Sequence, residues 1–444
     1  MAASAKMNMI IAGDGHTNIQ HEDSLTLNST NWSSNIPDCD LILTNPPFGT
    51  SEIDSLSNDD WKQFDIKSGK GQYLFLQKMV DSLKVGGEIC TVIDEGVLNT
   101  ESAKRLRKWL LQKCKLKAVF NLPSETFKPN KINVKSSLLY FEKRSVSDND
   151  FEDCYKVTVC KLDTLGYYGS GDKIRGFDLD KFLNEISTET LNYSNGDCRS
   201  GYYWKSFDVS ISDIIEDGTF RFDYKYWNTE IRKKINEIRV DGKEISKLNK
   251  IKTSRGKSPS ASNYVDKEDG YALVIKAGSN ISKQGKIVLS GADWIEKSIY
   301  DEFIEKSKES GENINLIRKG DVLLSSTGDG TLGKSCVFDL EIPAIADGHV
   351  TIIRIDHNEI DPYYLRDYLR LGFGSIQVNR LFTGSTGMIE LTPDHVDSII
   401  VNMRSNIKEQ KKLSKKLRKI EDKYMETLKQ AEEIHEEALT VLME

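Results

Sequence analysis

The chain has 444 residues, which at roughly 100 to 200 residues per domain corresponds to two to four domains. With 38% hydrophobic and 29% charged residues, it has the composition of an ordinary globular protein and not of a disordered or fibrous one. Its 61 basic and 68 acidic residues give a formal charge of −7, which argues against a uniformly basic nucleic-acid coat but allows local basic patches.

Targeting and metal-binding patterns are missing from the sequence. No run approaches about 18 consecutive apolar residues, and the first 30 residues do not form a signal peptide, so we expect no membrane insertion and a cytoplasmic location. The seven cysteines are scattered and form no CxxC pair, which predicts reduced thiols and no metal site.

The first third of the sequence alternates between two patterns. Stretches with apolar residues at i, i+3 and i+4 predict helices over 72–83 and 100–114. Short runs that are apolar on both faces predict strands over 41–44, 88–93, 116–122 and 136–142. Buried strands separated by helices predict a parallel α/β sheet. A polar stretch near 145–151 closes this block, and 152–203 has a mixed pattern.

From about residue 204 to 403 the pattern changes to short strand-like runs separated by glycines. Examples are YALVIKAG, GKIVLSG, GDVLLSSTG, KSCVFDL and HVTIIRID. We therefore expect a second domain that is mostly β with a few helices.

The last segment, 407–444, contains no Gly or Pro and carries apolar residues about every 3.6 positions, which predicts one long amphipathic helix. Residues 408–423 include eight basic and three acidic side chains, a net of +5, whereas 424–444 include one basic and six acidic side chains, a net of −5. Two copies laid antiparallel would pair opposite charges along their length. Packing of the helix on its own domain is the alternative.

A rigid turn follows the first predicted strand. Asn45, Pro46, Pro47 and Phe48 come directly after the apolar run 41–44, and open α/β sheets bind ligands at the carboxyl ends of their strands. The two prolines fix φ and remove two amide donors, so the carbonyl groups of the turn are free to accept. The Asn45 side chain and the Pro46 carbonyl could both accept from one exocyclic NH₂, while a flipped-out base could stack on Phe48. This arrangement fits methylation of adenine N6, and the alternative is a structural turn with a core phenylalanine.

This Asn-Pro-Pro-Phe turn after a hydrophobic strand closely resembles the catalytic motif of amino-DNA methyltransferases. Over about residues 6–185 the sequence resembles the modification subunit of type I restriction-modification systems, in the stretches MNMIIAGDGHTNIQHEDSL, QYLFLQKMVDSLKVGGEICTVIDEGVL and AVFNLPSETF. The resemblance implies S-adenosylmethionine as the methyl donor and adenine N6 of double-stranded DNA as the acceptor.

Two further residues take roles from this resemblance. Asp23 of HEDSL matches the acidic residue that contacts the adenine of S-adenosylmethionine, and a helix or turn cap is the alternative. Phe127 of LPSETF matches a residue that lines the target-base pocket, and a buried core phenylalanine is the alternative.

The sequence departs from the family pattern at the cofactor loop. In the family a D-P-x-x-G-x-G pattern after the first strand precedes the Asn-Pro-Pro-Phe motif, but the 44 residues before Asn45 do not contain it. Gly13-Asp14-Gly15 has no third glycine and is interpreted as a turn. We therefore expect the methionine-binding half of the cofactor site to be absent from this chain.

Residues 204–403 resemble the target-recognition domain of type I specificity subunits, in FRFDYKYW, IRKGDVL, TGDGTLGKS, DPYYLRDYL and GSTGMIEL. A basic stretch, KLNKIKTSRGKS, could neutralise DNA phosphates, and a solvated loop is the alternative. Its predicted substrate-binding residues are Lys250, Lys252, Arg255 and Lys257, next to Lys247.

One motif imitates a nucleotide-binding loop. The segment from Gly328 to Ser335 satisfies GxxxxGK[ST] after an apolar strand. A phosphate-binding loop needs a following helix, whereas the residues after this segment have a strand pattern and include Pro343. We interpret it as a turn between strands.

The fold that we expect is α/β: a partial parallel-sheet methyltransferase fold, then an α+β target-recognition domain and a long C-terminal helix. The expected domains are 1–143, a methyltransferase tail or linker over 144–203, 204–403 and 404–444. The predicted function is adenine-specific DNA methylation within a restriction-modification system, with the terminal helix joining a second copy or restriction and specificity subunits. The alternative is a catalytically incomplete DNA-binding or specificity subunit that needs a partner chain for methylation.

Overall fold

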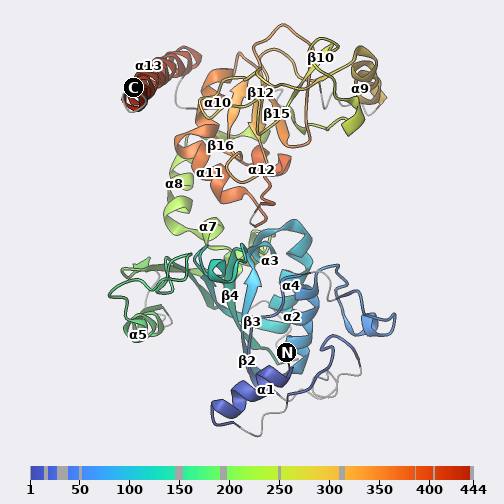
Figure 1. Cartoon of the computed structure of the whole chain (residues 1–444), viewed down its shortest axis with the longest axis vertical. Helices are drawn as coiled ribbons and strands as arrows, with labels where there is room; N and C mark the ends of the chain where they lie inside the picture. The colour runs from blue at the N-terminus through green and yellow to red at the C-terminus, as the bar shows by residue number, and fades with distance from the viewer. Residues whose placement is uncertain are drawn as a thin grey trace. The chain divides into compact units, whose positions relative to one another are not determined.

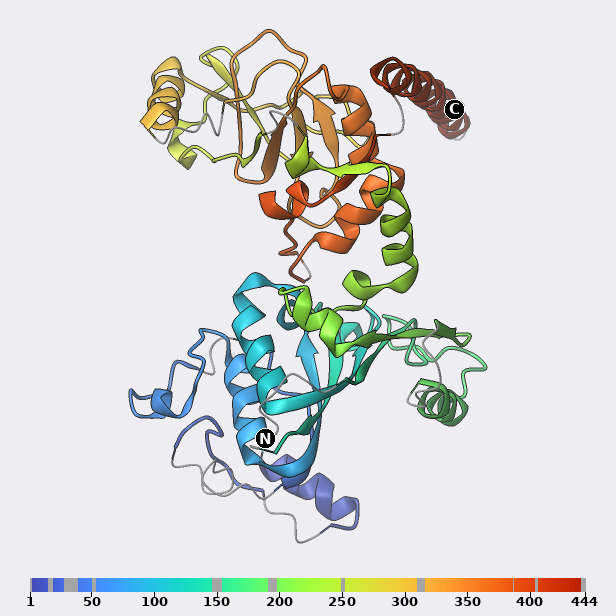
Figure 2. The same cartoon turned by 180° about the vertical axis from the view of Figure 1, so that it is seen from behind.

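The computed structural model describes residues 2–14, 19–27, 39–49, 53–145, 154–190, 198–248, 252–309, 316–385, 387–403 and 406–440. The chain folds into two compact units, Met1–Thr229 and Glu230–Glu444, hereafter unit 1 and unit 2. Figures 1 and 2 show each unit from two sides.

Unit 1 is built around a sheet with the strand order β1-β2-β4-β3-β5-β7-β6. Its strands are β1 (Cys39–Thr44), β2 (Leu83–Asp94), β3 (Cys114–Asn121), β4 (Ser136–Lys143), β5 (Lys156–Leu162), β6 (Arg199–Ser200) and β7 (Trp204–Ser210). Its helices are α1 (Ala2–Ile11), α2 (Gly71–Ser82), α3 (Glu95–Asn99), α4 (Lys104–Lys113), α5 (Leu179–Thr190), α6 (Ile211–Glu216) and α7 (Tyr224–Trp227). The predicted strands correspond to β1 to β4 and the predicted helices to α2 and α4, so these predictions are confirmed.

The sheet contains parallel pairs, but it is mixed. The pairs β1–β2 and β3–β5 are parallel, whereas β4 runs antiparallel to both of its neighbours, β2 and β3. The physical reason lies in the connection between β3 and β4, whose only helical element is the short 3-10 turn Lys128–Asn130. A parallel return usually runs through a crossover helix. This connection has none, and the chain comes back antiparallel.

Hydrophobic burial on both faces holds this sheet together. Ile89 and Ile93 of β2 have no exposed surface. Helix α2 contacts β2 and helix α4 contacts β3, and both helices lie beside the sheet (Figure 1). On the other face, Phe182 and Ile186 of α5 pack against Trp204 of β7 and the side chains of β5. The sheet is therefore a packed layer whose strand ends are held in place.

The segment 204–227, which we expected to open the second domain, lies in unit 1. β7 pairs antiparallel with β5 over its whole length. Arg107 of α4 donates to the carbonyl oxygens of Thr219 and Phe220 at 2.9 and 2.7 Å, which ties the following loop to the helix layer. The residues before α7 therefore complete the first unit.

The described residues of unit 2 form three small sheets, with the orders β11-β10-β14, β13-β12-β15-β9 and β16-β8. Its strands are β8 (Gly242–Glu244), β9 (Lys252–Arg255), β10 (Ala272–Ile275), β11 (Trp294–Ile295), β12 (Val322–Ser325), β13 (Ser335–Val337), β14 (Ala344–Ala346), β15 (Val350–Arg354) and β16 (Ile400–Asn402). Its helices are α8 (Thr229–Arg239), α9 (Lys297–Glu309), α10 (Pro362–Arg370), α11 (Gly372–Leu381), α12 (Pro393–Asp397) and α13 (Ile407–Thr440). A buried cluster that includes Leu273, Leu323 and Ile352 joins the first two sheets.

The long C-terminal helix is confirmed as α13, and its first turns dock on unit 2 through polar contacts. Gln410 is buried and accepts from the Asp361 backbone N–H at 2.9 Å, while Glu421 pairs with Arg370 at 2.6 Å. In the described part of the chain, no helix combines the length and apolarity that crossing a bilayer requires.

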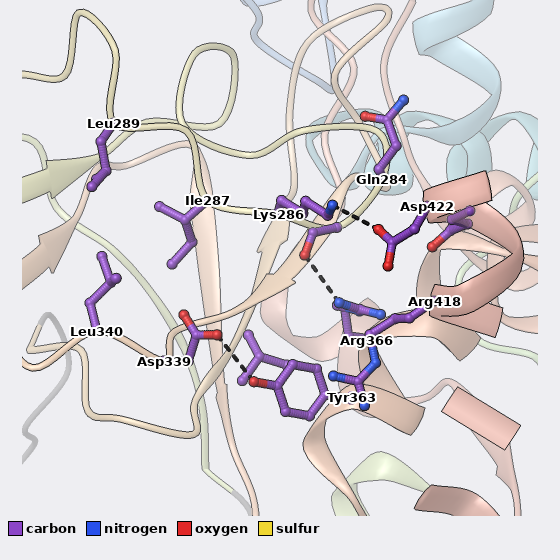
Figure 3. Close-up of a pocket in the computed structure, with 13 residues that line it drawn as sticks. Gln284, Lys286, Ile287, Leu289, Asp339, Leu340, Tyr363, Arg366, Arg418 and Asp422 are labelled. Atoms are coloured by element: carbon purple, nitrogen blue, oxygen red, sulfur yellow. Dashed lines mark hydrogen bonds and ion pairs between the residues drawn. The ribbon is translucent and has the colours of Figure 1, made fainter. Parts of the chain in front are cut away.

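A cavity of about 370 Å³ lies where α13 meets the body of unit 2 (Figure 3). The Arg418 guanidinium of α13 lies 4.4 Å from the centre of the Tyr363 ring, and the Tyr363 hydroxyl donates to Asp339 at 3.1 Å. Lys286 pairs with Asp422 of α13 at 3.0 Å. Because these charges are used to attach the helix, we assign the cavity to the docking of α13.

Candidate functional site

The turn Asn45–Phe48 lies where the sequence places it, directly after β1. Thr44, the last strand residue, pairs with Thr91, and β2 continues for three more residues to Asp94. Asn45 is exposed, Pro46 is buried and Phe48 is half-buried. The amide side chain therefore projects into solvent at the carboxyl edge of the sheet, while the turn behind it is anchored.

Phe127 lies against Phe48. The two ring centroids are 5.6 Å apart and the ring planes meet at 69°, an edge-to-face contact. Phe127 belongs to the loop after β3, and the Tyr167 hydroxyl donates to the neighbouring Thr126 carbonyl at 3.0 Å. The structure thus brings together the two aromatic residues that the sequence assigns to base binding, from loops that follow different strands.

Asp23 organises a turn. Its carboxylate accepts from the backbone N–H of Leu25 at 3.0 Å and from the Ser55 hydroxyl at 2.8 Å, and its carbonyl accepts from the Thr26 hydroxyl. Leu25 belongs to a small apolar cluster with Phe64 and Leu74. These contacts are those of a turn cap, and contact with a cofactor adenine stays a prediction.

A buried polar cluster at the same edge of the sheet was not predicted. Glu95, the first residue of α3, is almost fully buried, and its Oε2 accepts from Asn121 Nδ2 at 2.9 Å and from the Ser137 hydroxyl at 2.8 Å. Its backbone N–H donates to the Lys135 carbonyl at 3.0 Å. Glu95 therefore fastens together the end of β2, the end of β3, which carries Asn121, and the start of β4, which carries Ser137.

Burial sets the ionisation of this cluster. It raises the pKa of Glu95, against the attraction of Lys135 and the Ser137 hydrogen bond, and it lowers the pKa of Lys225 well below the ordinary lysine value. Burial alone would raise the pKa of Asp223, but the paired Arg221 outweighs it, and the pKa is lowered. Several buried ionisable side chains with shifted pKa values, as found here next to strand ends, are common at functional sites.

Residues 219–223 are bonded to α3 and α4. Arg221 binds the Asp223 carboxylate through two nitrogens, at 2.8 and 2.7 Å, and both side chains are buried. The Phe222 backbone N–H donates to the Leu98 carbonyl of α3 at 3.0 Å. The burial of these charged side chains has one indication in the sequence. Charged residues interrupt two apolar runs, IDEGVL and FRFDYKYW.

The predicted DNA-binding residues of unit 2 that the structure describes differ in their surroundings. Lys250 lies outside the described residues. Lys252 and Arg255 lie on β9, and Arg255 donates to Glu390 at 3.0 Å and to the Leu391 carbonyl at 2.7 Å. Lys257, beyond the strand, is exposed. The Arg255 side chain is therefore hydrogen-bonded within unit 2, whereas the Lys257 side chain is exposed to solvent.

The GxxxxGK[ST] segment is a turn between strands, as we expected. It joins β12 to β13, which pair antiparallel, and a strand follows it in place of a helix. Gly328, Gly330 and Gly333 have φ between +77° and +86°, a left-handed conformation that glycine adopts without strain. The Thr331 hydroxyl bridges the carbonyl groups of Thr327 and Gly328 across the turn.

The described residues before β1 do not fit the methionine-binding half of an S-adenosylmethionine site. Gly13 ends α1, because its backbone N–H donates to Ile10 and that of Asp14 donates to Met9. Within the described ranges 2–14 and 19–27, no glycine-rich loop follows a strand. The only acidic residue with a predicted cofactor role here is Asp23.

Comparison with known proteins finds relatives of the first part of the chain. Residues 2–188 match the family model described as N-6 DNA Methylase. The EcoEI methylase subunit of Escherichia coli, a type I restriction enzyme component, is 30% identical over 140 residues, which are 31% of this chain and 27% of that protein. The EcoKI methylase subunit of Escherichia coli strain K12 is 29% identical over 155 residues, 34% of this chain and 28% of that protein. The first part of the chain, residues 2–188, is therefore similar to type I methylase subunits.

The match covers only part of these relatives, because the chain spans about a quarter of their length. Among solved structures, the type IIL restriction-modification enzyme MmeI in complex with DNA is 13% identical, with a TM-score of 0.45, over 93% of this chain and 54% of that one. The relatedness to methylase subunits therefore concerns unit 1.

We predict that Glu95→Gln makes the protein at least as stable as the parent at neutral pH. Folding raises the pKa of Glu95 above the roughly 4.3 of an unfolded glutamate. The stabilising contribution of the protonated Glu95 side chain is therefore present below the pKa of the unfolded state. It is lost as the pH rises through the pKa of the folded state. The variant cannot ionise, so its melting temperature relative to the parent should rise between pH 4 and pH 8, as measured by calorimetry.

Glu125→Gln is the control, because the Ser124 hydroxyl lowers the pKa of Glu125 and the sign reverses. Its relative melting temperature should stay level or fall over the same range. A relative melting temperature of Glu95→Gln that falls with rising pH would contradict the assignment.

Proposed function

We propose that the chain is the modification component of a restriction-modification system and that, in its assembled form, it methylates adenine N6 at a specific DNA site with S-adenosylmethionine. The observation that supports this most directly is the Asn-Pro-Pro-Phe turn at the carboxyl edge of the sheet, with Phe127 packed against Phe48. The relatedness to type I methylase subunits gives independent support.

The residues of the turn define the acceptor side of the reaction. The exposed Asn45 amide oxygen and the Pro46 carbonyl would accept hydrogen bonds from one exocyclic amine, which pulls its geometry toward tetrahedral and directs its lone pair outward. An extruded base would stack on Phe48, beside Phe127. S-adenosylmethionine, when bound, supplies the methyl group, and the described residues account only for holding the amine.

Recognition of the DNA sequence is assigned to unit 2. Its resemblance to target-recognition domains, in segments such as IRKGDVL and DPYYLRDYL, supports this proposal. The exposed Lys257, rather than the engaged Arg255, is the better placed of the predicted phosphate contacts.

The long helix supports a proposal of homodimer formation. The face of α13 that contacts unit 2 carries Gln410, Ser414 and Glu421. The apolar stripe lies on a different face and stays exposed, at Leu413, Ile420, Tyr424, Leu428 and Ile434. The basic and acidic halves of α13 are complementary in charge. A second copy of α13 in antiparallel orientation would therefore cover the stripe. It would also relate two recognition units by a two-fold axis. The DNA target would then be an interrupted palindrome.

We predict that Asn45→Ala abolishes methyl transfer by the assembled enzyme while specific DNA binding persists, because only the amine acceptor is lost. Incorporation of labelled methyl groups into DNA and a gel-shift assay measure the two properties. Asn184→Ala, on the exposed surface of α5, is the control. Methylation within about tenfold of the parent would rule out this role for Asn45.

We predict that Phe48→Ala weakens capture of the extruded base by roughly 1 to 3 kcal/mol, whereas Phe48→Tyr is tolerated because the ring remains. Fluorescence of 2-aminopurine at the target position reports extrusion. Phe127→Ala should show a smaller additional loss in the Phe48→Ala background than alone, because the two rings are in contact. Additive losses would argue against a shared pocket wall.

We predict that charge reversal of Lys412, Lys415, Lys416 and Lys419 to Glu dissociates the dimer. All four side chains are exposed on α13, so the change places acid against acid without disturbing the helix attachment. Reversal of Glu432, Glu433, Glu436 and Glu437 to Lys in the same chain should restore association. Sedimentation is the measurement, and a salt-insensitive monomer at micromolar concentration for the parent would rule out the homodimer.

A further inference from the structure

A short hairpin of unit 1, residues 166–174, lies between β5 and α5 and has no role in the site described above. Tyr167 and Lys173 pair as an antiparallel bridge outside the main sheet. The backbone N–H of Ile174 donates to the Gly166 carbonyl at 2.8 Å. These contacts give the 166–174 hairpin a fixed shape of its own.

The base of the hairpin is anchored in the apolar interior of unit 1. Leu165 and Phe177, which flank it, pack against the buried cluster that contains Leu122 and Trp204. Gly166 has a φ of +92°, and a Cβ atom at this position would lie 2.5 Å from the Phe177 ring. Only glycine combines this backbone conformation with this close approach. The hairpin is therefore a held structure.

The hairpin packs against the loop that carries Phe127. The Tyr167 hydroxyl donates to the Thr126 carbonyl at 3.0 Å. A Cβ atom at Gly171 would meet Pro129 Cβ at 3.5 Å, which is van der Waals contact. Since Phe127 lies between Thr126 and Pro129 in the chain, the hairpin lies beside the proposed base-binding pair.

Three basic side chains of these two segments are without a protein partner. Lys131 follows the Phe127 loop, Lys173 closes the hairpin, and Arg175 comes directly after it. All three are exposed, and within the described residues no hydrogen bond or ion pair involves any of their side chains. Their positive charges are therefore available to a ligand.

The acidic side chains of the same segments are already bonded. Glu125 pairs with Lys128 at 3.4 Å, and the Asp172 carboxylate accepts from the Ser170 hydroxyl at 2.8 Å. Residues 124–135 and 166–176 together contain five basic and two acidic side chains, a net of +3, although the whole chain has a net charge of −7. The surface beside Phe127 is thus a local basic patch in an acidic protein.

A basic patch in this position fits the phosphate groups of DNA. Extrusion of a base turns its nucleotide about the backbone, so the phosphates on both sides have to be held while the base is out of the stack. Lysine and arginine neutralise phosphates, and tyrosine hydroxyls donate to them. Tyr168, next to the bridge residue Tyr167, is 56% exposed.

We propose that the 166–174 hairpin, with Lys131 and Arg175, is a DNA-backbone contact on unit 1 that holds the phosphates next to the extruded adenine. The proposal rests on the proposed function and adds a binding surface to the same site. Phosphate contacts carry no sequence information, so this surface would hold the target strand while unit 2 recognises the sequence.

The first experiment measures how salt changes the binding of the full chain to a DNA duplex that contains its target site. In the variant with both Lys173→Ala and Arg175→Ala, the slope of log binding constant against log salt concentration should become shallower by about 2, since each phosphate contact contributes about 0.9. The two side chains are exposed and unpaired, so the variant should melt like the parent. An unchanged slope would overturn the proposal.

The matched control removes the same charge at the opposite end of the sheet. Lys113 and Lys156 are exposed and lie at the amino ends of the parallel strands β3 and β5, whereas the Phe127 loop follows the carboxyl end of β3. The variant with both Lys113→Ala and Lys156→Ala should keep the parent slope. An equal change of slope in both variants would mean a general effect of net charge and would overturn the proposal.

A conservative variant and a second readout separate DNA from a protein partner. Lys173→Arg with Arg175→Lys keeps both charges and should keep the parent slope. If Lys173→Ala with Arg175→Ala abolishes self-association in sedimentation while the slope stays unchanged, the hairpin is a protein contact and the proposal is wrong.

The slope comes from binding alone, so it separates this proposal from the proposed function. A shallower slope in a protein whose assembled form transfers no methyl group would support the hairpin contact and contradict the function. Methyl transfer that depends on Asn45, together with an unchanged slope, would support the function and overturn the hairpin contact.

Discussion

The parallel pairing of β1 with β2 is the constraint on which the rest of unit 1 depends. It brings the turn after β1 and the start of α3 to one edge of the sheet, so Asn45 and Glu95 lie at neighbouring strand ends. The antiparallel β4 adds Ser137 to the same edge from the opposite direction. The Asn-Pro-Pro-Phe turn and the buried hydrogen-bond cluster of Glu95 therefore share one framework.

The main effect of the Glu95 cluster is to hold strand ends in place, and not to stabilise the folded protein. A buried carboxyl whose pKa is raised destabilises the folded state at neutral pH relative to a neutral isostere. In return, one carboxylate oxygen holds Asn121 and Ser137, six and ten residues from Phe127 along the chain. Functional sites often contain residues that lower the stability of the fold and hold other groups in position.

Unit 2 attaches its long helix by a polar face and leaves the apolar stripe exposed. Ion pairs such as Arg370–Glu421 fix the orientation of α13 on unit 2. An exposed apolar stripe of this length is typical of an interaction surface. The stripe therefore supports the proposed pairing of two copies through α13.

The sequence by itself determined the types of β1 to β4, α2 and α4, the long helix and the Asn-Pro-Pro-Phe turn, because these depend on local periodicity and on proline geometry. It also named Phe48, from the turn, and Phe127, through a family resemblance, but only the structure shows that their rings are in contact. Only the tertiary structure decided that β4 runs antiparallel, that residues 204–227 complete unit 1, that Arg255 is tied to Glu390, and that Glu95 is buried among Asn121 and Ser137. These features arise from contacts between residues far apart in the chain, and no local pattern specifies such contacts.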